Sequence, residues 1–293
     1  MIIARTISDM RAAVNTLKQQ QIAAGIVPSV GFVPTMGYLH EGHASLMRAA
    51  KDCSISVLSI FVNPIQFGPN EDLDRYPRDE ARDLQLAEQC GVDVVFLPTV
   101  DIMYPSARKT TIQVTDVSAR LCGASRPGHF DGVTTVVAKL FNIVKPDRAY
   151  FGMKDAQQVA VIQQMVDDLN FDLTIVPCPI VREQDGLALS SRNVYLCAEE
   201  REQALVLSQA LQSIDALLEQ HPSLTAADLV TVLQETITTK PLAKIDYVEV
   251  LQFPSLQPQL TNEPLVQSQT QVIVALAVHF GRTRLIDNRL LFA

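Results

Sequence analysis

The sequence lacks cysteine pairs at metal-binding spacing, long apolar runs and any excess of basic residues. Its cysteines are scattered and contain no Cys-x-x-Cys, which excludes a zinc ribbon and a disulfide framework. We expect them to be reduced core residues of a cytoplasmic protein. The late apolar run from Val272 to Val278 is too short to span a bilayer, and Met1 to Arg5 is too short for a signal peptide. The cysteines are Cys53, Cys90, Cys122, Cys178 and Cys197.

The charge balance argues against polyanionic partners. The chain has 24 Lys+Arg against 32 Asp+Glu, a net charge of -8, which disfavours binding to a nucleic acid or to an anionic membrane surface. Small ligands remain compatible with this balance through local basic groups. With 293 residues, 47% of them hydrophobic, the chain can form one large domain or two ordinary ones around a real core.

The most informative stretch is residues 30–43. A short apolar run ends at a proline, a turn follows, and the apolar spacing after His43 predicts a helix, so the order is strand, loop, helix. Gly37 and Gly42 let the backbone pass close to a ligand, and the free N–H groups at the start of the helix favour an anion. His40 and His43 add donors of adjustable charge at the same place.

A His-x-x-His pair also fits a surface or core pair, or half of a metal site. A P-loop is excluded, because nothing in the chain matches Gly-x-x-x-x-Gly-Lys-Ser/Thr. The pair lies directly after an expected strand and directly before an expected helix, with glycines on both sides. This context favours a cradle for a nucleotide triphosphate in which histidines replace the lysine of a P-loop.

Strands and helices are expected to alternate through residues 1–179, which predicts a Rossmann-like α/β domain with a parallel sheet. The run 54–62 is nearly continuous in apolar and β-branched residues, as a strand buried on both faces requires. Residues 101–131 are looser in pattern, and we expect a loop there that lines a pocket. The expected strands are 30–34, 54–62, 92–98, 148–151 and 173–177, and the expected helices are 8–20, 44–51, 78–89, 133–144 and 156–169.

Residues 180–293 are expected to form a smaller C-terminal α+β domain. Apolar residues at helical spacing between Leu207 and Leu218 predict one helix, and Thr225 with Asp228 predicts a capping box at the start of a second. The expected strands of a small antiparallel sheet are 245–251, 272–279 and 283–286.

Several motifs resemble one known family. Pro34-Thr35-Met36-Gly37 with His40-Glu41-Gly42-His43 resembles the His-x-Gly-His signature of the nucleotidyltransferase superfamily, in the form carried by the pantoate–β-alanine ligase family. Further stretches are similar to that family, in the right order and across nearly the whole chain. They are Phe61 to Gly68, Arg126 to Val133, and the run from Gly152-Met153-Lys154-Asp155 through Gln157-Gln158 to Ser190-Ser191-Arg192-Asn193.

The resemblance implies an ATP-dependent ligase of pantothenate biosynthesis. ATP and pantoate would give a pantoyl adenylate and pyrophosphate, and β-alanine would then displace AMP. Because a carboxylate must approach an anionic α-phosphate while charge grows on the leaving pyrophosphate, the site needs cations and N–H donors. The resemblance also implies Mg²⁺ brought with ATP, and a homodimer, to which the apolar strand 54–62 adds weak support.

The resemblance assigns roles to the matching residues. His43, with His40 beside it, is expected to donate to phosphate charge, Lys154 suits a phosphate oxygen and Asp155 suits ribose hydroxyls. The residues expected in catalysis are His40, His43, Lys154, Ser190, Ser191 and Arg192. The residues expected to bind ATP are Met36, Gly37, Tyr38, Leu39, His40, Glu41, Gly42, His43, Gly152, Met153, Lys154, Asp155, Val181, Leu189, Ser190, Ser191 and Arg192.

Gln66 and Gln158 match the family's pantoate ligands, and Gln66 is expected to serve β-alanine as well. Residues 187–193 are similar to the mobile second signature of the superfamily, related in position to the Lys-Met-Ser-Lys-Ser loop of aminoacyl-tRNA synthetases. Two hydroxyls and a guanidinium within three residues suit a polyphosphate. Val181 matches the position whose backbone meets the adenine.

Three residues depart from the family pattern. Leu189 stands in place of methionine, Ala156 in place of an aromatic residue, and Met153 where glutamate is common. None of the three removes a phosphate donor, so we expect them to affect affinity more than activity.

Two other functions stay open. One is a nucleotidyltransferase that transfers AMP to another small acid or phosphate, and the other is an RNA-binding relative of a tRNA synthetase that has lost catalysis. Gln66 and Gln158 together argue against the first. The acidic balance and the retention of both His40 and His43 argue against the second.

Overall fold

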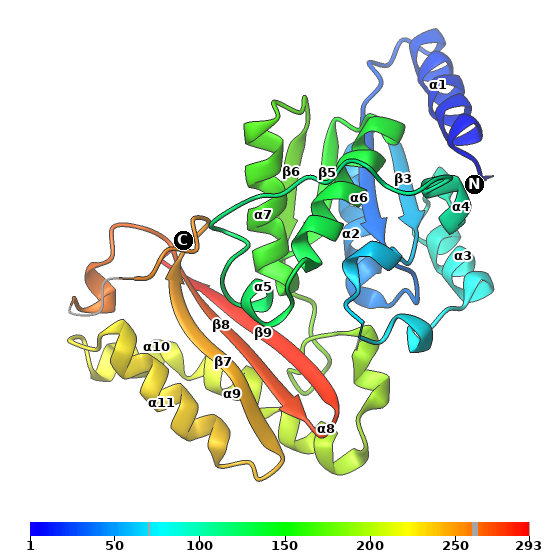
Figure 1. Ribbon diagram of the computed structural model, residues 1–293. Coiled ribbons are helices and arrows are strands. Elements are labelled where there is room, and N and C mark those ends of the chain that lie inside the picture. The colour runs from blue at the N-terminus through cyan, green and yellow to red at the C-terminus, as the bar shows by residue number, and fades with distance from the viewer. Residues whose placement is uncertain (70, 260–262, 293) are drawn as a thin grey trace.

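The computed structural model describes residues 1–69, 71–259 and 263–292. In these residues a six-stranded parallel sheet forms the N-terminal half of the molecule (Figure 1). The strand order is β1-β4-β3-β2-β5-β6, and the pairs are parallel throughout. The strands are β1 Ile2–Ala4, β2 Val30–Thr35, β3 Ile55–Ile60, β4 Val94–Phe96, β5 Arg148–Gly152 and β6 Thr174–Cys178. The helices of this half are α1 Ile7–Ala23, α2 Glu41–Ala49, α3 Glu80–Gln89, α4 Val100–Met103, α5 Cys122–Ser125, α6 His129–Val144 and α7 Ala156–Asp168.

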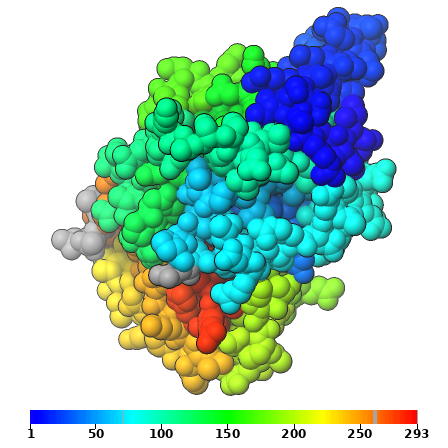
Figure 2. Space-filling model, turned by 45° about the vertical axis from the view of Figure 1, so that its right-hand side comes forward, coloured from blue at the N-terminus to red at the C-terminus, as the bar shows by residue number. Residues whose placement is uncertain are grey.

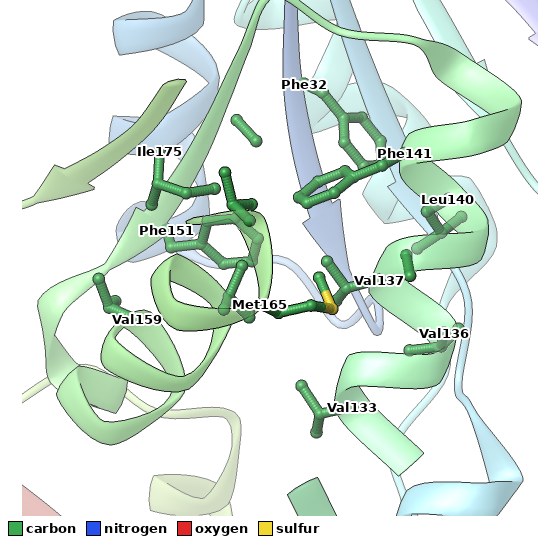
Figure 3. Packing of buried hydrophobic residues seen from close by; sticks show 14 of the residues in the cluster. Phe32, Val133, Val136, Val137, Leu140, Phe141, Phe151, Val159, Met165 and Ile175 are labelled. Atoms are coloured by element: carbon green, nitrogen blue, oxygen red, sulfur yellow. The ribbon is translucent and has the colours of Figure 1, made fainter. Parts of the chain in front are cut away.

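Helices cover both faces of this sheet, because successive strand residues point to opposite sides. Phe32 on β2 belongs to the buried cluster that contains residues of α1, α6 and α7, whereas its neighbour Val33 packs with residues of α2 and α3. In the first cluster, Phe32 meets Phe141 of α6 edge to face, with ring centroids 6.4 Å apart (Figure 3). The expected Rossmann-like fold is confirmed.

The strand order reverses between β2 and β5. The connection through α2 leads from β2 to β3 on one side, and the connection through α7 leads from β5 to β6 on the other. At such a switch point the loops after two adjacent parallel strands diverge and leave a crevice at their carboxyl ends. The loops concerned are residues 36–40 after β2 and 153–155 after β5, the second of which is the 3₁₀ turn η4.

The C-terminal half contains the antiparallel strands β7 Ala243–Gln252, β8 Val272–Phe280 and β9 Thr283–Leu291. It also contains η5 Ser191–Tyr195, α8 Ala198–Ala204, α9 Val206–Gln212, α10 Ile214–Gln220 and α11 Ala226–Thr238. Val274 packs with the C-terminal helices, whereas Ile273 and Ala275 lie in the same buried cluster as α6 and α7. The small sheet therefore joins the two halves. The turn between β8 and β9, at Gly281 and Arg282, lies beside the segment that contains Asp72 and Arg75 (Figure 2).

Most expected elements agree with the structure, including the α11 capping box made by Thr225 and Asp228. The edge strand β1 was not expected, because two exposed residues and one buried residue are too few to show a period. Helix α6 begins at His129, not at residue 133, since Gly128 has the left-handed φ of 77° that ends the preceding loop. The expected single helix across residues 207–218 is interrupted between α9 and α10. β9 runs beyond the expected residue 286 to Leu291.

Two expectations about surfaces need correction. The cysteines are free within the described residues, as expected, but Cys197 is exposed and is not a core residue. Strand β3 pairs with β2 and β4 inside the sheet, so burial accounts for its apolar sequence and it gives no support to a dimer. None of the described helices is long and apolar enough to cross a membrane.

Candidate active site

His40 and His43 lie against each other at the start of α2, with ring centroids 4.1 Å apart and ring planes tilted by 39°. His40 is the N-cap residue, and its Nδ1 accepts the backbone N–H of Gly42 at 3.1 Å. Nδ1 of His43 accepts the backbone N–H of His40 at 3.2 Å. Because Nδ1 is an acceptor in both rings, a neutral imidazole at either position carries its proton on Nε2. The helix start therefore presents two Nε2–H donors of fixed tautomer.

Both imidazoles are neutral at ordinary pH. Burial, followed by the charges of Lys154 and Arg82, lowers the pKa of His40 to about 4. Burial, followed by His40 and Lys154, lowers the pKa of His43 to about 3. The lowered pKa values favour neutral hydrogen-bond donors at both positions, and the expectation of adjustable charge stays a prediction.

Asp83 of α3 shapes the loop between β2 and α2. Its carboxylate accepts the backbone N–H groups of Tyr38 at 2.8 Å and Leu39 at 2.7 Å. Gly37 has a φ of 86°, and a Cβ there would lie 2.9 Å from both Asp83 Oδ2 and Ile60. The glycine is thus required by backbone conformation and by space. The sequence did not predict this role of Asp83, because no local pattern connects it with a loop 45 positions away.

The loop after β3 lies against the first turn of α6. A Cβ on Gly132 would come within 2.5 Å of Gln66 Cα, so the glycine permits this approach. Nδ1 of His129 donates to the carbonyl oxygen of Gln66 at 2.9 Å, and Nε2 accepts from the Arg126 guanidinium at 3.0 Å. Arg126 is bound in turn to the carboxylate of Glu71. The motif at 126–133 therefore fixes the backbone of Gln66.

The side chain of Gln66 is 9% exposed and lies behind Met36. Its Nε2 lies 3.2 Å from the Met36 sulfur, and its Oε1 accepts from Asn63 at 3.0 Å. Burial, followed by Arg126, lowers the pKa of His129 to about 4, so the chain of contacts from Arg126 through His129 to Gln66 contains a neutral imidazole.

Residues 190–195 form the wall opposite the β2 loop. Ser190 Oγ accepts the backbone N–H of Arg192 at 3.2 Å and so caps η5. The Arg192 guanidinium is bound to Asp72 by two hydrogen bonds, and Tyr76 Oη lies 3.5 Å from Ser191 Oγ. The expected phosphate cation at position 192 is therefore held by a carboxylate that the sequence reasoning missed.

One cavity, which we call the switch-point cavity, opens between these loops. Its walls include thirteen of the residues expected from the resemblance: Met36, His40, Gly42, His43, Gly152, Lys154, Asp155, Gln158, Val181, Leu189, Ser190, Ser191 and Arg192. A second cavity shares Lys154, Asp155, Gln158, Ser190 and Arg192 with it and extends toward His129 and the C-terminal sheet. Four separate stretches of chain thus line the switch-point cavity, and the second cavity shares part of its wall.

Six expected residues do not line the switch-point cavity. Leu39 is fully buried, Tyr38 packs under the Arg82 guanidinium, and Glu41 is exposed and bound to Arg48. Gly37 lies beside Asp83 and Ile60, Met153 is the buried first residue of η4, and Gln66 contacts Met36. These positions shape the cavity from behind.

The described part of the chain contains no cluster of three or more His, Cys, Asp or Glu residues that could hold a metal ion. Asp155 is the carboxylate found among the described walls of the switch-point cavity. Mg²⁺ retains several waters and commonly binds one or two carboxylates together with substrate phosphates. The side chains present therefore fit a metal that arrives on a polyphosphate better than one held in a protein cage.

Comparisons with known proteins show similarity over nearly the whole chain. A family model described as Pantoate-beta-alanine ligase matches residues 2–290. The pantothenate synthetase of Caldicellulosiruptor saccharolyticus is 53% identical over 289 residues, which are 98% of this chain and 98% of the relative. The crystal structure of pantothenate synthetase from Thermus thermophilus has a TM-score of 0.88 and 44% identity and covers 99% of each chain.

A further similar structure contains ligands. It is the crystal structure of the pantoate-beta-alanine ligase from Francisella tularensis complexed with beta-gamma ATP and beta-alanine. It has a TM-score of 0.78 and 36% identity, and covers 99% of this chain and 97% of that one.

Proposed function

The chain belongs to the pantoate-beta-alanine ligase family, and on that premise we propose that both half-reactions of the ligase take place in the switch-point cavity. The enzyme catalyses the ATP-dependent condensation of pantoate with β-alanine. In the proposed first step a pantoate carboxylate oxygen attacks the α-phosphorus of ATP and pyrophosphate leaves. In the second step the β-alanine amine attacks the acyl carbon of the pantoyl adenylate, loses a proton and displaces AMP.

The phosphate groups of ATP lie, in this proposal, between the start of α2 and the turn at 153–155. Two neutral Nε2–H donors from His40 and His43 meet the phosphate oxygens, because the imidazole Nδ1 atoms already accept the backbone N–H groups of His40 and Gly42 at the helix start. Lys154 supplies the positive charge, and no ion pair of Lys154 is found in the described parts of the chain. Mg²⁺ enters as part of the MgATP substrate and offsets charge on the phosphates.

Pantoate and β-alanine would bind beside Gln158 and Gln66. Gln158 borders both cavities, and Gln66 lies behind Met36 with its backbone fixed by His129. An amide orients a hydroxy acid with N–H and C=O groups and leaves the attacking carboxylate charge largely intact. Gln66 would serve β-alanine as well, because the second nucleophile must reach the same acyl carbon.

The division into domains is also a proposal. We place residues 1–179 in an ATP- and pantoate-binding domain and residues 180–293 in a smaller lid domain. The change from parallel to antiparallel pairing after β6 supports this boundary. The buried cluster that includes Ile273 of β8 and residues of α6 and α7 argues that the lid rests on the first domain in this arrangement.

A homodimer and a cytoplasmic location remain proposals as well. The edge strand β1 exposes Ile2 and Ile3 at 41% and 43%, and an apolar strand edge of this kind is suited to an interface. Sedimentation of the wild-type chain at micromolar concentration, beside an Ile3→Glu variant, tests the dimer. A monomeric wild-type chain would contradict it.

The observation that carries the proposed mechanism is the convergence of His43, Lys154, Gln158 and Ser190 on one space. The test is AMP formation from MgATP and pantoate, with and without β-alanine. We expect one equivalent of bound adenylate without β-alanine and steady AMP release with it. Equal AMP turnover with unrelated short acids or amines would show that the cavity does not select these substrates.

A further inference from the structure

The turn that carries Lys154 is held by a residue from the other half of the molecule. Asn288 of β9 is 6% exposed, and its Nδ2 donates to the carbonyl oxygens of Met153 at 2.8 Å and Lys154 at 3.0 Å. Both N–H bonds of one amide group are thus used on two successive carbonyls of η4. The contact crosses from the C-terminal sheet to the end of β5.

This turn has little side-chain support of its own. β5 ends at Gly152 and α7 begins at Ala156, so the three residues between them change direction sharply. In the part of the chain that the structure describes, no side-chain cap is formed at the start of η4 or of α7. Buried carbonyl groups need donors, and an amide supplies them without adding a charge near the phosphate site.

Asn288 is itself held by strand pairing and by a hydrogen bond. On the edge strand β9 it pairs with Ala275 of the central strand β8, and its backbone N–H donates to Asp287 Oδ1 at 2.8 Å. The Asp287 carboxylate binds the Arg182 guanidinium at 2.6 and 2.9 Å. Arg182 forms an antiparallel β-bridge with Ala188. Beside it, the backbone N–H of Leu189 donates to the carbonyl oxygen of Val181 at 3.0 Å. Successive residues of β9 therefore hold two different walls of the switch-point cavity.

We propose that Asn288 is a positioning residue for ATP activation, which fixes the backbone of the Lys154 turn so that the Lys154 ammonium reaches the phosphates. A lysine binds phosphate as a point charge at the end of a flexible stem, so its useful reach depends on where its backbone lies. The inference rests on the proposed role of Lys154 in adenylation. It adds that the C-terminal sheet helps to build the phosphate site through a neutral amide.

Asn288→Asp tests this, because it keeps the shape of the side chain and replaces the donating Nδ2 by an oxygen that repels both carbonyls. We expect the single-turnover rate of adenylate formation to fall on the order of 10-fold to 100-fold, with the KM for pantoate nearly unchanged. Asn288→Ala removes the donor without adding repulsion, so its rate of adenylate formation should lie between that of Asn288→Asp and that of the wild type. Asn288→Ala also provides the test if Asn288→Asp does not fold.

Ser125→Ala is the matched control. Ser125 Oγ donates to the Asp246 carboxylate at 3.0 and 3.1 Å, so it also joins the two halves of the molecule, but it lies outside the walls of both cavities. We expect Ser125→Ala to retain the adenylation rate of the wild type. An equal loss in Ser125→Ala and Asn288→Ala would mean that any loosening between the halves slows the reaction, which would overturn the specific role of Asn288.

The decisive comparison places Asn288→Ala in a Lys154→Ala background. If Asn288 acts through Lys154, its substitution adds little further loss once the ammonium is gone. The same fold loss in both backgrounds would show that Asn288 acts independently of Lys154, and the inference would fail while the role of Lys154 stood. An unchanged rate in Lys154→Ala alone would instead overturn the proposed function at that residue.

Discussion

The guanidinium of Arg192 binds the carboxylate of Asp72 through Nε to Oδ2 at 3.0 Å and Nη2 to Oδ1 at 3.1 Å. Burial alone would raise the pKa of Asp72, but the hydrogen bonds and charge of Arg192 bring it below its usual value. The pair uses two of the five guanidinium N–H donors and offsets the positive charge, so it weakens the attraction of Arg192 for a polyphosphate. The ion pair therefore competes with the phosphate-binding role that the resemblance implies for Arg192, and it connects η5 to the segment after β3.

Removal of the competing carboxylate should favour ATP. We expect Asp72→Asn to lower the KM for ATP on the order of threefold, because a charge-assisted pair no longer has to break. Arg192→Ala should raise that KM on the order of 10-fold or more. Saturation curves for ATP check both. Asp74→Asn, which makes the same charge change at an exposed site two residues away, is the control. An equal change in the KM for ATP in Asp74→Asn would mean that the net charge of the protein, and not the pair with Arg192, causes the effect.

His43→Ala should reduce the adenylation rate by roughly 10²-fold and leave the fold intact, because the Nε2–H donor acts on charge that grows in the transition state. The control is His221→Ala at the exposed end of α10. Single-turnover measurement of adenylate formation checks the rate, and circular dichroism checks the fold. An unchanged rate in His43→Ala would remove this residue from the mechanism.

The pH profile of the wild-type rate tests the charge state of the same group. The pKa values of His40 and His43, lowered to about 4 and about 3, leave both rings neutral above about pH 6. We therefore expect no step between about pH 6 and about pH 8 that disappears in His43→Ala. A fall in rate with rising pH through that window, abolished by the substitution, would show that the imidazolium is the active form.

Gln66→Glu and Gln158→Glu should each raise the KM for pantoate steeply and leave that for ATP nearly unchanged. A second carboxylate facing the carboxylate of the substrate repels it, whereas the phosphates lie on the side of Lys154 and the histidines. A pair of saturation curves for each variant measures the effect. Gln164→Glu makes the same chemical change on an exposed part of α7 and is the control. Equal weakening of ATP and pantoate binding would contradict the assignment of these glutamines.

His129 should make the fold sensitive to acid. Its pKa in the folded state is lowered to about 4, below the value of about 6.5 for an unfolded histidine. Between these values the unfolded chain binds a proton that the folded chain refuses, so the free energy of unfolding falls as the pH falls through this window. We expect His129→Gln to reduce this slope in denaturation series between about pH 7 and about pH 5.

The control for that series is Thr231→Ala, an exposed change on α11 that alters no titratable group. It should keep the slope of the wild type. If His129→Gln also kept the full slope, acid sensitivity would have to come from other groups, and the imidazole would not be held neutral by burial.

Local patterns in the sequence determined much of this protein. The nearly unbroken apolar run that became β3 predicted a buried parallel strand, and the Thr225 capping box predicted the start of α11, because both signals lie within one element. The glycines and histidines after β2 predicted the loop and the helix start that the structure shows, and the anion site there stays a prediction. Motif resemblance then supplied the family and the order of the site residues.

Tertiary structure decided the contacts between distant segments. Asp83 holds the β2 loop, Asp72 holds Arg192 and Asn288 holds the Lys154 turn, with partners 44, 120 and 134 positions apart in the chain. No local period or spacing encodes such pairs, because they exist only after both sheets have formed and packed. Burial likewise decided the neutral state of His43, since the cost of placing a charge in the core depends on the surroundings of the ring and not on its sequence neighbours.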